Sequence, residues 1–91
     1  MHYVYVLQSD ADCGLYIGYT ANLRRRLSEH QSGMAVASAH RGPWRLIYYE
    51  AYIEEVDARG REVFLKSGAG RRFLSKQCRH HFAKCPLRTT A

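Results

Sequence analysis

The 91-residue sequence contains only two prolines and three cysteines, and it has no long apolar run. No stretch approaches the ~20 consecutive apolar residues that a membrane-spanning helix needs. Cys13, Cys78 and Cys85 are odd in number and unevenly spaced, which argues against a disulfide framework and favours a reducing compartment such as the cytoplasm. Met1 and His2 lead directly into a β-rich segment, so we expect no signal peptide.

Acidic residues are scarce in the last third of the chain. From Ala58 to the end, Glu62 is the single acid among nine basic residues, and the formal net charge of the whole chain is +6. Clustered cations displace counterions from phosphates, so this charge pattern predicts a polyanionic partner. The alternative is a basic surface that contacts only solvent.

The composition is that of an ordinary folded domain. Hydrophobic residues make up 46% of the chain and charged residues 24%, and a chain of 91 residues is long enough for one small core. We expect a single domain over residues 1–78, followed by a basic tail over residues 79–91.

Two short segments near the N-terminus have the alternating pattern of β-strands. Tyr3–Leu7 and Leu15–Thr20 are rich in β-forming residues, and the polar turn between them predicts an antiparallel hairpin. Such a hairpin places Tyr5 and Tyr16 near each other on one face. Gly18 lies on the same face as Tyr16 and marks a place of close approach to the backbone. Cross-strand packing of the two tyrosines is the plain alternative.

The next segment, residues 22–31, has the spacing of an amphipathic helix. Thr20 or Asn22 is the predicted cap, and Leu23 and Leu27 supply the packed side. Arg26 and His30 are four residues apart and therefore share one face. Successive helical residues are ~100° apart, so only one of the three consecutive arginines, Arg26, is expected to point toward the tyrosines.

The remainder predicts one more strand and two helices. Residues 32–43 are a loop whose Arg41 is placed to reach a ligand, and Trp44–Tyr52 has the composition of a third strand. Glu50 is interpreted as a surface charge. The predicted helices are Glu54–Ser67, with an apolar side made of Val56, Val63, Phe64 and Leu65, and Arg71–Gln77. The fold class is α+β, a mainly antiparallel three-stranded sheet flanked by about three helices.

The order of these motifs resembles that of the GIY-YIG nuclease superfamily, in particular its small single-domain members. The resemblance rests on Tyr3-Val4-Tyr5, Tyr16-Ile17-Gly18, the Arg26 and His30 pair and Glu62, and it covers about Tyr3 to Phe73. The first motif here is Tyr-Val-Tyr rather than Gly-Ile-Tyr, so only Tyr5 is carried over. Tyr19 stands where some members have a lysine.

The resemblance implies a metal-dependent endonuclease that hydrolyses phosphodiester bonds, with DNA favoured over RNA. It implies that Tyr5 or Tyr16 takes a proton from water, with its pKa lowered by nearby cations. It also implies that Arg26 clamps the phosphate, that His30 assists proton transfer or orients water or phosphate, and that Glu62 holds Mg²⁺ or Mn²⁺ mostly through water. The residues expected to contact nucleic acid are Gly18, Arg25, Lys66, Arg71 and Arg72.

Three alternatives stay open. The first is a non-catalytic nucleic-acid-binding module of the same fold. In the second, Glu62 is a helix residue that forms an ion pair with Lys66 four residues on. The third is a zinc site in the tail, where suitable ligands lie within eight residues of one another, although zinc sites normally pair two separated clusters. Its candidate ligands are Cys78, His80, His81 and Cys85.

Overall fold

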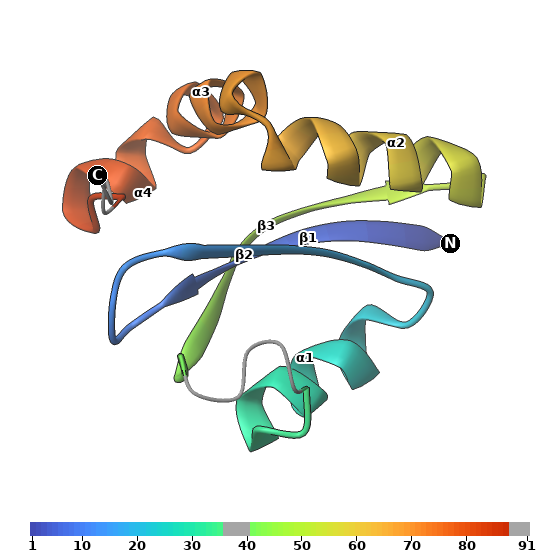
Figure 1. The fold of residues 1–91 in the computed structure, drawn as a ribbon, viewed down its shortest axis with the longest axis horizontal. Helices are drawn as coiled ribbons and strands as arrows, with labels where there is room; N and C mark the ends of the chain where they lie inside the picture. The colour runs from blue at the N-terminus through green and yellow to red at the C-terminus, as the bar shows by residue number, and fades with distance from the viewer. Residues whose placement is uncertain (36–40, 88–91) are drawn as a thin grey trace.

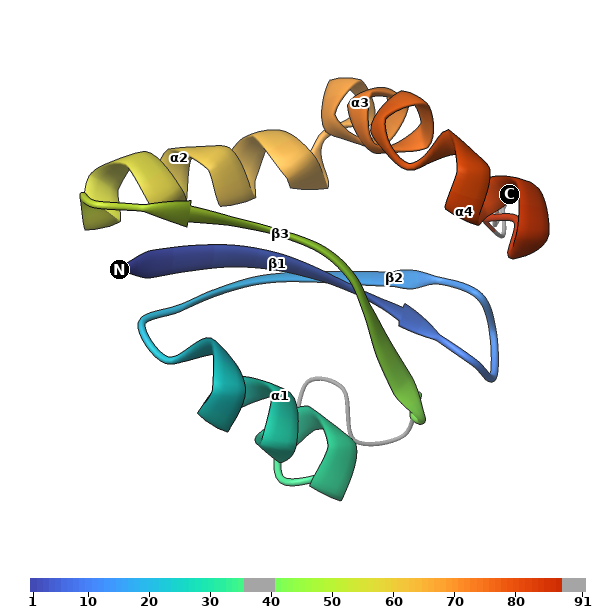
Figure 2. The same cartoon turned by 180° about the vertical axis from the view of Figure 1, so that it is seen from behind.

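The computed structural model describes residues 1–35 and 41–87, which form a three-stranded antiparallel sheet with helices on both faces (Figures 1 and 2). The elements are β1 (His2–Ser9), β2 (Leu15–Thr20), α1 (Leu23–Ser32), β3 (Trp44–Tyr52), α2 (Glu55–Lys66), α3 (Gly68–Gln77) and α4 (Arg79–Lys84). Helix α1 covers one face of the sheet, and α2 and α3 cover the other (Figure 1). The predicted α+β class is confirmed. No helix within the described ranges is long and apolar enough to cross a membrane.

Strand β1 lies in the centre of the sheet, in the order β2-β1-β3. It pairs antiparallel with both neighbours, and the register places Tyr5 opposite Gly18 on one side and opposite Tyr49 on the other. Directly opposed residues of a sheet point to the same face. Gly18, Tyr5 and Tyr49 therefore form a row across the face that α1 covers.

The two faces of the sheet have different cores. The α2 and α3 side is mainly aliphatic, and its buried residues are Val4, Val6, Leu15, Ile17, Ala58, Leu65 and Leu74. The α1 side is mainly aromatic: Tyr5, Leu7 and Trp44 are buried, and they pack with partly buried Tyr16, Leu23, Leu27 and Leu46. The strands supply both sets because successive side chains point to opposite faces.

Helix α1 begins as predicted, and of the two candidate caps Asn22 is the one used. Its side-chain oxygen accepts a hydrogen bond from the backbone N–H of Arg25, and the helix ends at Gly33, which has a φ of 79°. A left-handed residue at a helix C-terminus favours glycine because it has no Cβ.

The predicted apolar side of α2 is wrong in part. Val56 and Val63 are 81% and 71% exposed, whereas Ala58 and Leu65 are buried against the sheet. Val56 and Val63 are seven residues apart, and so are Ala58 and Leu65, so the helix carries two apolar stripes. The spacing in the sequence does not indicate which of the two stripes is buried. The small Ala58 side chain lets α2 approach the strands closely.

Glu50 is also not the plain surface charge that the sequence suggested. Its carboxylate accepts two hydrogen bonds from Arg61, at 2.9 and 3.1 Å, and it also accepts hydrogen bonds from the hydroxyls of Tyr48 and Tyr52. The Arg61 guanidinium lies 4.4 Å from the ring centre of Phe73. This cluster joins β3 to α2 and α3.

The chain after α2 is more helical than the sequence suggested. Helix α3 begins at Gly68 rather than Arg71, because the Ser67 hydroxyl accepts a hydrogen bond from the N–H of Gly70 and caps it. The unpredicted helix α4 carries Phe82, and Phe82 and Leu87 pack against the aliphatic core. A domain boundary at residue 78 stays a prediction. The middle of the predicted loop, residues 36–40, and the end of the predicted tail, residues 88–91, lie outside the described residues.

Candidate active site

Tyr5 and Gly18 interlock across the hairpin. The Tyr5 side chain is 1% exposed, and its ring crosses the backbone of the edge strand β2 at Gly18. A Cβ at position 18 would lie only 2.5 Å from the Tyr5 Oη, so a side chain there would displace the phenol. The missing side chain thus lets the hydroxyl reach the β2 edge of the sheet. A contact between Gly18 and nucleic acid stays a prediction.

His30 and Tyr16 complete an aromatic cluster with Tyr5 between the sheet and α1. The Tyr5 hydroxyl and His30 Nε2 are 2.9 Å apart, and the ring centres of Tyr16 and His30 are 4.8 Å apart. The Tyr5 and Tyr16 ring centres are separated by 6.3 Å, as the predicted hairpin requires. Burial, reinforced by the positive charge of Arg26, holds the pKa of His30 below its usual value. The imidazole is therefore neutral at pH 7.

Arg26 joins this cluster from the same helix. Its guanidinium interacts with the hydroxyls of Tyr5 and Tyr16, and its Nη1 donates to Glu29 Oε1 at 2.8 Å. Glu29, and secondarily the phenols, raise the pKa of Arg26, so it stays charged. The sequence argument missed Glu29, although its position three residues after Arg26 could have indicated the pair. Arg25, which is exposed, lies 3.9 Å from the same carboxylate.

The surroundings of Tyr5 do not lower its pKa, contrary to the expectation for a tyrosine base. Burial is the largest effect and raises the pKa of the phenol, while hydrogen bonding to Arg26 opposes it only in part. The charges of Tyr16 and Glu62 raise this pKa further. Loss of hydration raises the pKa of Tyr5 by more than the Arg26 cation lowers it, because a phenolate needs more solvation than a phenol. Tyr5 therefore keeps its proton at neutral pH.

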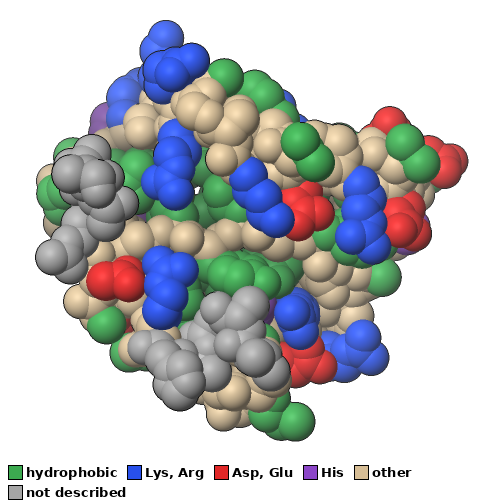
Figure 3. All heavy atoms as spheres, in the orientation of Figure 1, with side chains coloured by type: hydrophobic (Ala, Val, Ile, Leu, Met, Phe, Trp, Pro, Cys, Tyr) green, Lys and Arg blue, Asp and Glu red, His purple; other side chains and the backbone are tan. Residues whose placement is uncertain are grey.

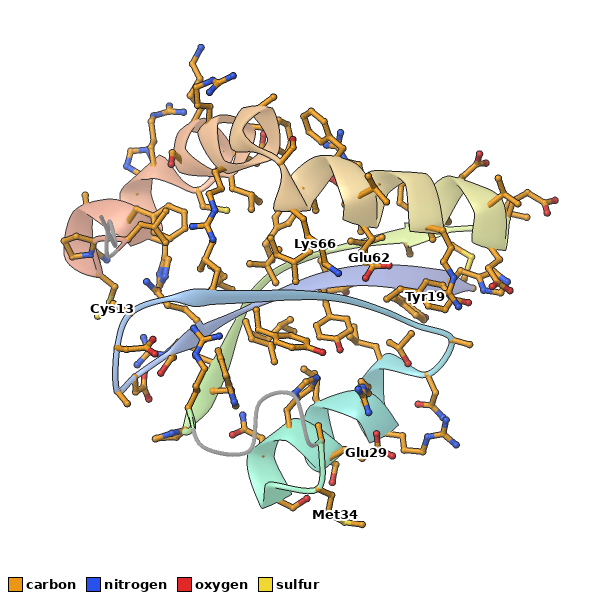
Figure 4. All side chains as sticks on the ribbon, in the orientation of Figure 1. Cys13, Tyr19, Glu29, Met34, Glu62 and Lys66 are labelled. Atoms are coloured by element: carbon orange, nitrogen blue, oxygen red, sulfur yellow. The ribbon has the colours of Figure 1, made fainter. Side chains whose placement is uncertain are left out.

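Glu62 belongs to the opposite helical layer but lies within electrostatic reach of Tyr5, since its charge contributes to the raised pKa of that phenol. Figure 4 shows Glu62 and Lys66 projecting from α2 toward the sheet, with Glu29 on the α1 side. The Lys66 Nζ donates to Glu62 Oε2 at 2.9 Å, so the predicted ion pair exists. The Glu62 side chain is 17% exposed and the Lys66 side chain 55%.

Basic side chains flank this region in both layers. Figure 3 shows Lys and Arg over the helical layer above the sheet and over the α1 layer below it. Arg71 and Arg72 are exposed on α3, and their contact with nucleic acid stays a prediction. Arg41 pairs with Asp12, with Nε and Oδ2 3.1 Å apart, and its guanidinium lies over the Trp44 ring.

Metal-ligating side chains are not grouped in the described part of the chain. Within residues 1–35 and 41–87, no three His, Cys, Asp or Glu side chains come close enough to hold a metal ion together. In the described part of the chain the four candidate zinc ligands Cys78, His80, His81 and Cys85 do not lie together as one group, and His81 hydrogen-bonds Gln8 at 2.6 Å. Glu62 alone fits a hard divalent ion only if the ion keeps most of its waters, as Mg²⁺ commonly does.

Comparison with known proteins agrees with this geometry. A family model described as the GIY-YIG catalytic domain matches residues 1–73. A UPF0213 protein of Clostridium perfringens is 39% identical over 67 residues, which cover 72% of this chain and 71% of the relative. A UPF0213 protein of Natronomonas pharaonis is 45% identical over 67 residues, which cover 72% and 78%.

A solved structure is similar over almost the whole length. The solution NMR structure of a UPF0213 protein from Bacillus halodurans has a TM-score of 0.56 and 31% identity, and the match covers 98% of each chain. Family match, sequence relatives and fold agree with the motif order of the sequence. The chain belongs to the GIY-YIG family.

Proposed function

We propose that this protein is a metal-dependent endonuclease that hydrolyses phosphodiester bonds in nucleic acid, with DNA favoured over RNA. A fold does not by itself imply an activity, so the proposal depends on the site. The observation that carries it is the gathering of two phenols, an imidazole and a guanidinium at the β2 edge, with the Glu62 carboxylate within electrostatic reach.

The proton path follows from the hydrogen bonds of Tyr5. The Arg26 cation acts on the Tyr5 oxygen, and in this path the phenolic proton lies toward Nε2 of the neutral His30, 2.9 Å away. As water loses a proton to the Tyr5 oxygen, Tyr5 passes its own proton to His30, and the phenol never becomes a free phenolate. The resulting hydroxide attacks phosphorus, and the bond from phosphorus to the leaving alkoxide breaks. Tyr16, which is less buried, is the alternative base.

The charged residues have complementary tasks. Arg26 is always protonated and offers paired N–H donors to the phosphoryl oxygens, where negative charge develops. Glu62 is the residue that would hold a Mg²⁺ or Mn²⁺ ion, which when bound stabilises charge on the phosphate and the leaving group. Lys66 must release the Glu62 carboxylate for this purpose, and its ammonium is then available to a phosphate.

A plasmid-nicking assay with Mg²⁺ or Mn²⁺ tests the proposal. We expect Arg26→Ala and Glu62→Gln to reduce nicking by roughly 10²- to 10³-fold, the usual loss for a preorganised charge-stabilising group. Glu55→Gln is a matched control for Glu62, because Glu55 also forms an i,i+4 ion pair on α2, with Arg59. Arg45→Ala, which removes an exposed, ion-paired arginine of β3, is the control for Arg26. Both control variants should nick plasmid at a rate within about two-fold of the parent protein. This change is far smaller than the loss expected for Arg26→Ala and Glu62→Gln.

The same assay separates the alternatives. Nicking that survives both Arg26→Ala and Glu62→Gln would show that the site lies elsewhere. A parent protein that binds nucleic acid but cuts none of the DNA and RNA substrates offered would instead be the non-catalytic binding module.

A further inference from the structure

A groove on the α1 side of the sheet takes no part in the reaction described above. It lies between α1 and the strands β1 and β3, and its walls include Leu23, Leu27 and Leu46. Two tyrosines, Tyr3 and Tyr49, and the guanidinium-bearing Arg24 also line it. The groove is open to solvent, and the Tyr49 ring is exposed at it.

The two tyrosines give the groove flat aromatic surfaces. Their ring centres are 6.2 Å apart and their planes are inclined at 58°. Tyr49 is 52% exposed, which is unusual for a large ring in the middle of a strand that faces a helix. Exposed aromatic rings above an aliphatic floor are the kind of surface on which nucleobases stack.

The charge of the groove suits the same ligand. Arg25 and Arg26 both approach Glu29, whereas Arg24 forms no ion pair within the described part of the chain. Among the residues that the structure describes, no acidic side chain lines the groove. An arginine without an acidic partner at the edge of an aromatic surface can bind a phosphate or stack on a base through its planar guanidinium.

The groove is adjacent to the candidate active site in the sheet. Tyr49 is the register partner of Tyr5, and Tyr5 in turn faces Gly18, so the row spans two strand spacings or about 10 Å. Ala21 and Asn22, which also line the groove, directly follow β2. A nucleic acid strand at the β2 edge can therefore reach the groove by passing the segment that joins β2 to α1.

We propose that this groove binds one unpaired nucleobase of the substrate strand, stacked against Tyr49 and Tyr3, with Arg24 on a neighbouring phosphate. The proposal deepens the proposed function and rests on it, because the ligand is the nucleic acid that the active site would cut. A base within a duplex is stacked on its neighbours, so this subsite takes a base from a single-stranded or locally opened segment.

Binding of a fluorescent single-stranded oligothymidylate, measured by anisotropy in EDTA, tests this inference without any cleavage. Base–aromatic stacking is worth ~1–3 kcal/mol by alanine substitution, so Tyr49→Ala should weaken binding by roughly 5- to 150-fold. Tyr49→Phe keeps the ring and should bind within about two-fold of the parent, because only stacking is required. Ile53→Ala, which truncates an exposed apolar side chain just after β3, is the control and should leave binding unchanged.

Two further measurements identify the contacts. A 2-aminopurine base in the oligonucleotide should be quenched on binding to the parent protein and not on binding to Tyr49→Ala, since the quenching requires stacking. Arg24→Ala should weaken binding of all sequences and reduce the slope of log affinity against log salt by about one, as expected for one phosphate contact.

The outcomes separate this inference from the proposed function. A protein that nicks plasmid but whose Tyr49→Ala variant binds the oligonucleotide normally keeps the function and overturns the inference. A protein that never nicks but loses binding in Tyr49→Ala keeps the groove and overturns the function. If Tyr49→Ala changes the oligomeric state in sedimentation and leaves oligonucleotide binding intact, the groove is a contact between copies of the chain, and the inference is wrong.

Discussion

The two faces of the sheet use the same three strands for different purposes. On the α2 and α3 side, aliphatic residues and the small Ala58 and Gly70 bring helices close to one another and to the strands. On the α1 side, phenols, an imidazole and a guanidinium lie together, with a hydrogen bond between Tyr5 and His30, and the groove beside them stays open. The first face holds the domain together, and the second keeps polar groups ready for a ligand at some cost in stability.

The two glycines in closest contact show this difference directly. A Cβ at Gly70 would lie 2.0 Å from the carbonyl oxygen of Phe64 and 2.4 Å from the Cα of Leu65, both backbone atoms. A Cβ at Gly18 would meet only the far end of the Tyr5 side chain. Backbone in a packed helix pair cannot move aside, whereas a ring can. The same substitution should therefore damage the fold on one face and the site on the other.

Gly70→Ala should have the largest effect. It forces α2 and α3 apart, and we expect the free energy of unfolding to fall by about 3 kcal/mol or more, at or beyond the upper end of the usual range for overpacking. Urea denaturation followed by circular dichroism measures the loss. An unchanged midpoint would show that the contact between the two helices is looser than described.

Gly18→Ala should separate activity from stability. Displacing the Tyr5 hydroxyl by about 1 Å should reduce plasmid nicking by about 10²-fold, while unfolding free energy falls by only ~1–2 kcal/mol. Gly60→Ala is the matched control because nothing lies within 4 Å of a Cβ there. In that exposed helical position alanine should stabilise the protein by ~0.5–1 kcal/mol and leave nicking unchanged. Equal losses of activity and stability in Gly18→Ala would argue against the special role of Tyr5.

The α1 face should also be the one that responds to mild acid. The folded pKa of His30 is below 6.5, so the unfolded chain binds a proton first as the pH falls. The stabilisation from neutral His30 is complete above pH ~6.5 and is lost as the pH falls from there through the folded pKa. Urea midpoints measured between pH 7.5 and 5 should fall, and His30→Asn should flatten this dependence. A parent profile that is already flat over this range would contradict burial of a neutral imidazole.

The smallest effect should come from the ion pair of Lys66 and Glu62. Lys66 is more than half exposed, and i,i+4 pairs on a helix surface contribute little. Lys66→Met should therefore change the free energy of unfolding by less than ~0.5 kcal/mol. The melting temperature, compared with that of Arg59→Met at a similar i,i+4 pair, checks this value. A loss above 1 kcal/mol would mean that the pair is a structural element of α2.

Local patterns were sufficient to predict much of the fold. Alternation of side chains gave the hairpin, composition gave the third strand, and the spacing of Leu23 and Leu27 with a capping Asn22 gave α1. Within that framework the spacing of Arg26 and His30 brought these two side chains to Tyr5 and Tyr16, as the structure shows. Their catalytic roles stay part of the proposal.

Other features depended on contacts between distant residues. The sequence did not indicate which apolar stripe of α2 is buried, because the burial of Ala58 and the exposure of Val56 are set by how the helix packs against the sheet. Helix α4 has a weak pattern and is positioned by Phe82 and by the bond from His81 to Gln8.

The amino-acid sequence by itself determined the strands, the first helix, the family motifs and the basic character of the chain, since each depends on neighbours within about seven residues or on composition. Only the tertiary structure decided that the Tyr5 phenol is buried and protonated and that Tyr3 and Tyr49 border an open groove. Burial, charge and exposure are set by which segments approach one another in space, and local periodicity carries no information on that.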